Sequence, residues 1–168
     1  MKRLWISSLL LSSLILGAAV DAAEARPARV PYTQTINKTG RYGGNVQGQA
    51  TVVPTANGVK AGGSGTIYGP RGGSGSANGT FSGNQTSGSM QGSANWSAPN
   101  SSGSASGSAT YNQGTVNGSG TVSATSQKTG QTYSGSGSAT YNKTTGGAAT
   151  VTTQNGTKTY TLPPAPSQ

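Results

Sequence analysis

The sequence predicts an all-β protein built as an antiparallel meander of about eight to ten strands. Two observations lead to this fold class: a short pattern recurs along the chain, and small or apolar residues alternate with polar ones at the period of a β-strand. Turn sequences separate the repeats. The connections are too short for the crossovers that parallel strands need, which favours antiparallel pairing.

The recurring pattern is Gly, any residue, Ala or Gly, Thr or Asn, and then a larger apolar residue. Its first five apolar ends lie 14 or 15 residues apart, at Val52, Ile67, Phe81, Trp96 and Tyr111, and the copy that ends at Phe81 is a near match that begins with Ala77. Self-similarity at a regular spacing indicates a repeated structural unit. Later copies have less even spacing and end at Val122, Tyr141 and Val151.

Each repeat also has two parities. Over residues 116–124 one parity holds Val, Gly, Gly, Val and Ala, and the other holds only Asn, Ser and Thr. Because successive strand residues point to opposite sides of a sheet, the sequence predicts one face of small and apolar residues and one face of hydroxyl groups. A helix would mix the two sets.

The first half of the chain gives five strands. Val30, Tyr32 and Ile36 share a parity, so a strand is expected near 30–36. Asn57-Gly58 is a strong hairpin signal, and further turn signals are Gly-Pro-Arg-Gly at 69–72 and Ala-Pro-Asn at 98–100. These signals place the next strands near 45–53, 59–68, 73–82 and 89–97.

The second half gives five more strands. Turn residues at 128–130 and 144–146 and the Asn155-Gly156 signal divide it. The expected strands lie near 103–112, 116–126, 131–142, 148–154 and 157–162. Because large apolar residues are few, an open single sheet is expected to be unstable. We therefore expect a closed barrel, a two-layer sandwich or stacking with other copies, with a β-solenoid or a disordered chain as alternatives.

The domain organisation begins with a signal peptide. Lys2 and Arg3 precede an apolar stretch, and Ala23-Glu24-Ala25 forms a small-x-small cleavage site. We expect a signal peptide at 1–25, a basic segment at 26–44, a Gly/Ser/Thr-rich repeat domain at 45–162 and a Pro-rich tail at 163–168. The mature chain is then secreted to the periplasm, cell surface or extracellular space, and it has no transmembrane segment.

The mature chain lacks the side chains that most enzymes use. From Ala25 to Gln168 there is no Asp, Glu, His or Cys. Acid–base pairs, thiolate nucleophiles and the usual metal-ligand sets are therefore excluded. The sequence predicts a protein that is not an enzyme, without catalytic residues, metal ligands or a cofactor.

The positive charge indicates the class of partner. The chain has a net charge of +9, which favours an anionic polysaccharide or another cell-envelope polymer. In a meander alternate turns share an end, so we expect an anionic-partner site at one end, formed by Lys38, Arg41, Arg71, Lys128 and Lys158. Lys60 and Lys143 would lie at the other end. Specific nucleic-acid binding is not expected, because the aromatic residues are not interleaved with the basic ones.

These observations predict an exported surface or extracellular matrix protein, adhesive or self-assembling, that binds anionic polymer. The strand near 30–36 is a candidate for pairing with another copy. Rows of outward hydroxyl groups also suit a repeating surface such as glycan or ice, although Thr favours exposed strands in any case. The alternative function is a soluble β-barrel that carries a small apolar ligand, with Trp96, Tyr111, Tyr133 and Tyr141 as its contacts.

Overall fold

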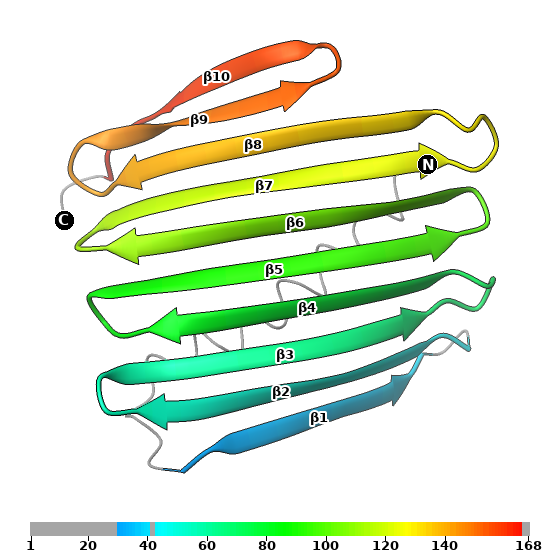
Figure 1. Cartoon of the computed structure of the whole chain (residues 1–168), viewed down its shortest axis with the longest axis horizontal. Helices are drawn as coiled ribbons and strands as arrows, with labels where there is room; N and C mark the ends of the chain where they lie inside the picture. The colour runs from blue at the N-terminus through cyan, green and yellow to red at the C-terminus, as the bar shows by residue number, and fades with distance from the viewer. Residues whose placement is uncertain (1–29, 41–42, 166–168) are drawn as a thin grey trace.

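The computed structural model describes residues 30–40 and 43–165. The predicted signal peptide, Arg41 and the last three residues of the Pro-rich tail lie outside these ranges. The described residues form ten antiparallel strands in one sheet, with strand order identical to sequence order (Figure 1). The strands are β1 (Tyr32–Thr39), β2 (Asn45–Thr55), β3 (Gly58–Tyr68), β4 (Ser74–Gly83), β5 (Ser87–Ala98), β6 (Ser101–Asn112), β7 (Thr115–Ser126), β8 (Thr132–Asn142), β9 (Gly146–Thr153) and β10 (Gly156–Leu162).

The predicted fold class, an antiparallel all-β meander, is confirmed. All ten expected strands form, and the largest difference is β1, which covers Tyr32–Thr39 where 30–36 was expected. This strand belongs to the basic segment at 26–44, yet it pairs with β2 along its whole length. The sheet therefore begins before the repeat domain that the sequence outlined.

The expectation of a closed barrel or a two-layer sandwich is wrong for the described chain. The sheet is open, with β1 at one edge and β10 at the other (Figure 1). A physical reason lies in the register, because every neighbouring pair runs one-to-one without a β-bulge. Bulges and kinks supply the local bend that lets a sheet curl and close.

The continuous register separates the two faces cleanly. One face of β2–β9, here called the apolar face, extends from the row that contains Trp96 to the row that contains Tyr111. Tyrosine hydroxyls aside, Thr153 is the one polar residue on it. A row of six directly paired glycines crosses this face from β3 to β8: Gly63, Gly79, Gly92, Gly107, Gly120 and Gly137.

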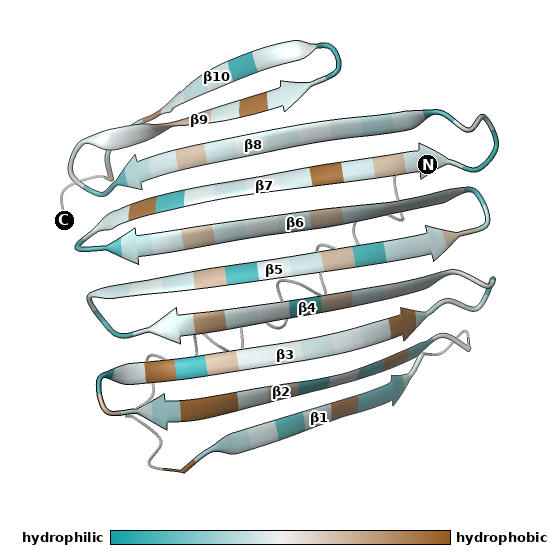
Figure 2. Ribbon diagram, viewed as in Figure 1, coloured by the Kyte–Doolittle hydropathy of each residue, from teal (hydrophilic) through white to brown (hydrophobic). Residues whose placement is uncertain are grey.

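The opposite face, here called the polar face, carries mainly Ser, Thr, Asn and Gln. Figure 2 shows that the strands of the whole sheet are mostly pale or teal, with isolated hydrophobic bands. Among the described apolar residues only Ala77 and Ala94 are buried, at 5% and 7% exposure. The described chain therefore has no conventional hydrophobic core, and backbone pairing along long strands provides most of its contacts.

A two-residue turn keeps β6 and β7 in register. Gln113 and Gly114 connect β6 to β7 with φ angles of 46° and 83°, and the flanking Asn112 and Thr115 are paired. Positive φ at both central residues is the signature of a type I′ turn, whose twist matches that of the strands. This turn keeps β6 and β7 paired from end to end.

Candidate functional site: the polar face of the sheet

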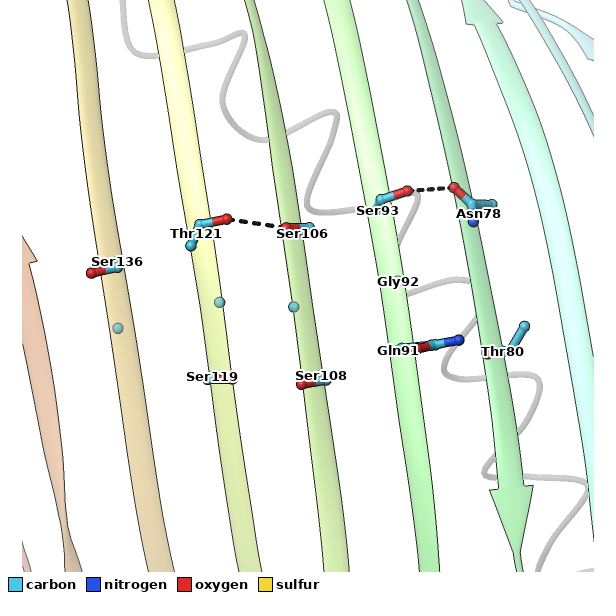
Figure 3. A pocket seen from close by; sticks show the side chains of 13 residues that line it. Asn78, Thr80, Gln91, Gly92, Ser93, Ser106, Ser108, Ser119, Thr121 and Ser136 are labelled. Carbon is cyan, nitrogen blue, oxygen red and sulfur yellow. Dashed lines mark hydrogen bonds between the residues drawn. The ribbon is translucent and has the colours of Figure 1, made fainter.

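The polar face contains a hollow over the middle of β4–β8. Its volume is about 530 Å³. Figure 3 shows the hollow with short hydroxyl and amide side chains projecting from the strands around it. The lining side chains are those of Asn78, Thr80, Gln91, Ser93, Ser106, Ser108, Ser119, Thr121 and Ser136, and the backbone of Gly92, Gly107, Gly120 and Gly137 completes it.

A second hollow of about 540 Å³ adjoins the first. It lies over β2–β6, and Thr80, Gln91 and Ser108 line both hollows. The two hollows therefore form one continuous depression, here called the polar groove, that crosses seven strands. Lys60 is the single charged residue among those that line it.

Hydrogen bonds between neighbouring strands hold several groove side chains in place. Ser93 Oγ donates to Asn78 Oδ1 at 2.5 Å, and the hydroxyls of Ser106 and Thr121 share a hydrogen bond at 3.0 Å (Figure 3). All four residues lie in one row across β4–β7. A hydroxyl that makes one such bond keeps acceptor capacity for a ligand.

The groove offers many donors and acceptors at regular intervals. Adjacent strands lie about 4.8 Å apart, and residues of one face recur about every 6.8 Å along each strand. The arrangement is a shallow, open grid of hydroxyl and amide groups. Such a surface fits an extended ligand that itself carries hydroxyl groups at regular intervals.

The structure places the predicted cationic residues along one end of the sheet without gathering them. Lys38 lies one residue from the end of β1, Arg71 lies in the β3–β4 turn and Lys128 in the β7–β8 turn, all at the same end. The two turns are four strands apart, which corresponds to about 19 Å. Arg41 lies outside the described residues. These side chains form a sparse row of positive charge rather than a single site.

Lys158 does not lie at that end, so this part of the expectation is corrected. Lys158 pairs with Val151, which pairs with Gly137 at the middle of β8. The reason is that the β9–β10 hairpin is short: its turn lies level with Gly135 and does not reach the end of the sheet where the β7–β8 turn lies. Lys60 lies near the opposite end of the sheet and Lys143 in the β8–β9 turn there, as expected. Sequence reasoning looked for charge and overlooked the groove, although the polar parity of 104–110 and 117–123 already indicated it.

The aromatic residues do not enclose a ligand. Trp96 and Tyr133 lie in one row of the apolar face, while Tyr111 and Tyr141 lie in a row near the other ends of the strands. Tyr133 is 54% exposed, and its hydroxyl donates to Gln131 Oε1 at 2.6 Å. Because the sheet is open, the barrel interior that the apolar-ligand alternative requires does not form.

Comparison with known proteins adds no relative. Searches of family models, of curated proteins and of solved structures return no match to this chain. Within residues 30–40 and 43–165 no helix is long and apolar enough to cross a membrane. The groove and the charges around it are therefore the features of this chain that bear on its function.

Proposed function

We propose that the protein is an exported, non-enzymatic surface or matrix protein that binds an acidic polysaccharide along its polar face. The observation that carries this proposal is the groove across β2–β8, which hydroxyl and amide side chains line over β4–β8 and which Val53 and Lys60 join at its β2–β3 end. Sugar hydroxyls donate and accept hydrogen bonds as these side chains do. An extended chain lying in the groove would meet the same types of group on strand after strand.

The charge supports an acidic polymer over a neutral one. Between Ala25 and Gln168 the side chains that carry a charge at pH 7 all belong to Lys or Arg. Lys60 lines the groove, and Arg71, Lys128 and Lys143 lie in turns at the two ends of the strands that the groove crosses. Positive charge without neighbouring acids attracts anions over a range set by the salt concentration.

The test compares an acidic and a neutral polymer. We expect polygalacturonate in the gel to slow the migration of the purified full chain in affinity electrophoresis, and dextran to slow it less. Thr80→Val should weaken both interactions, because Thr80 lines both hollows. Thr66→Val is the matched control, since Thr66 lies on the polar face of β3 outside both hollows.

Two results would refute the proposal. One is the absence of retardation by either polymer, and the other is an equal effect of Thr80→Val and Thr66→Val. Retardation by dextran alone would retain the groove as the site and reject the acidic ligand. Raising the salt concentration should weaken polygalacturonate binding and leave dextran binding unchanged.

A further inference from the structure

We propose that the apolar face packs against the apolar face of a second copy of this chain, forming a two-layer dimer. This inference goes beyond the proposed function and concerns the side of the sheet that faces away from the groove. The observation that motivates it is an uncharged surface across β2–β9 that no other described element covers.

Large side chains on this face are open to solvent. Val116, Tyr133 and Val151 lie on it with exposures of 44%, 54% and 44%. Soluble monomers seldom expose one contiguous apolar patch over a whole sheet face. The exposure of Val116, Tyr133 and Val151 therefore indicates a surface that is covered in the functional assembly.

The available area is sufficient for a stable dimer. Eight strands about 4.8 Å apart and about 30 Å long present a flat area of about 1,100 Å² per copy. Two such faces would bury about 2,200 Å² in total, which exceeds the roughly 1,600 Å² of a standard specific interface. Partial overlap of the two sheets would therefore still reach the standard size.

The relief of the face suits a second copy of itself. Bulky side chains lie toward both strand ends, including Trp96 in one row and Phe81, Met90 and Tyr111 toward the other end. The row of six glycines lies between them. If the second sheet is shifted along the strand direction, its bulky side chains lie over the glycine row of the first sheet. The bulky side chains of the first sheet then lie over the glycine row of the second. Such interdigitation of large and small residues is the way packed sheets fill the space between them.

The distribution of charge favours a dimer over growth of the sheet at its edges. Lys38 on β1 and Lys158 on β10 both lie on the apolar side, one at each edge. Inward-pointing charges on edge strands oppose edge-to-edge pairing. In a face-to-face dimer both lysines stay at the solvated rim, and both polar faces point outward. Assembly by this face therefore stops at two layers.

Two glycines provide matched variants. A Cβ at Gly118, on the apolar face, would meet Ala109 Cβ at 3.6 Å, and one at Gly62, on the polar face, would meet Gly79 O at 3.7 Å. Both are ordinary contacts, so each site accepts a side chain. Gly118→Glu and Gly62→Glu change the net charge equally and place the carboxylate on opposite faces of the sheet.

We expect analytical ultracentrifugation of the full chain to show a dimer, and Gly118→Glu to shift it to a monomer. Gly62→Glu should remain dimeric and should weaken polygalacturonate binding, because Gly62 lines the groove. Since two positively charged copies repel each other, raising the salt concentration should tighten the dimer by several-fold. The same change weakens binding to an acidic polymer, so the two proposals have opposite salt dependences and can fail separately.

A second readout does not depend on a substitution at glycine. The chain has no cysteine, so Ala105→Cys on the apolar face and Ser104→Cys on the polar face provide single labelling sites. Maleimide should modify Ala105→Cys several-fold more slowly at dimer-forming concentrations than at high dilution, with no such change for Ser104→Cys. A monomer at all concentrations, equal effects of both glutamates, or a monomer that binds phosphatidylglycerol vesicles through this face would overturn the inference.

Discussion

The indole ring of Trp96 on β5 lies over Gly103, its direct partner on β6, so that a side chain at Gly103 would overlap the ring. Tyr111 covers Gly88 in the same way near the other end of the same two strands. In each pair an aromatic ring shields the backbone of a glycine across the strand boundary, which compensates for the missing side chain. The two pairs stabilise the pairing of β5 with β6 near both ends of these strands.

Gly103→Val should destabilise the fold by about 1–3 kcal/mol, because the new side chain would displace Trp96 and press on Ser123 O. Urea unfolding followed by far-ultraviolet circular dichroism measures the change. Gly118→Ala is the control, since its Cβ makes only ordinary contacts. Equal stability of the two variants would contradict the role assigned to the Trp96–Gly103 pair.

Tyr111 has two separable contacts. Its hydroxyl donates to the carbonyl of Asn84, and its ring stacks on Phe81 with a centroid separation of 6.4 Å and an interplanar angle of 7°. Tyr111→Phe should cost about 0.5–1.5 kcal/mol, the typical net value of one hydrogen bond. Tyr111→Ala should cost more, because it also removes the stacking and uncovers Gly88. Equal melting temperatures of Tyr111→Phe and Tyr111→Ala would argue against the ring contact.

The turn at Gln113 is a place where the protein should gain stability. Gln113 is the one described residue other than glycine with a positive φ, and Asn tolerates this conformation better than Gln. Gln113→Asn should raise the melting temperature, with a gain of a few tenths of a kcal/mol up to about 1 kcal/mol. The matched control is Gln85→Asn, at an exposed position in the β4–β5 turn without positive φ. No gain at Gln113 relative to this control would speak against the type I′ turn.

The groove lysine should act through its charge. Lys60→Gln should weaken binding to polygalacturonate and flatten its salt dependence, because one positive charge beside the bound polymer is lost. Lys143→Gln removes the same charge from a turn that lines neither hollow, and it should have a smaller effect. Isothermal titration at two salt concentrations distinguishes the variants, and indistinguishable affinities would assign the interaction to net charge alone.

Much of the fold could be predicted from the sequence because the alternation is local. The period of two and the turn residues at 57–58 and 128–130 are enough to place the strands and to divide them into a polar and an apolar face. Closure could not be predicted in this way. It depends on bulges and bends between strands, and the one-to-one pairing that keeps the sheet open becomes visible only when all registers are known.

The site was less predictable for a related reason. Charge is conspicuous in a sequence, and the meander predicts Lys158 at the end of the sheet, whereas the short β9–β10 hairpin leaves it level with the middle of β8. The groove is formed by serines and threonines that look alike in the sequence. Only the register of the paired strands β2–β8 shows which of these residues, such as Thr80 and Ser108, line the same groove.

The order of the strands also determines how the chain can acquire its structure. Each strand pairs only with the strands that precede and follow it in the sequence, so every new pairing closes a loop of a few residues and costs little chain entropy. The sheet can therefore grow by one strand at a time from its N-terminal strand. No step has to wait for a distant segment, because the strands already paired keep their hydrogen bonds before the C-terminal strands form.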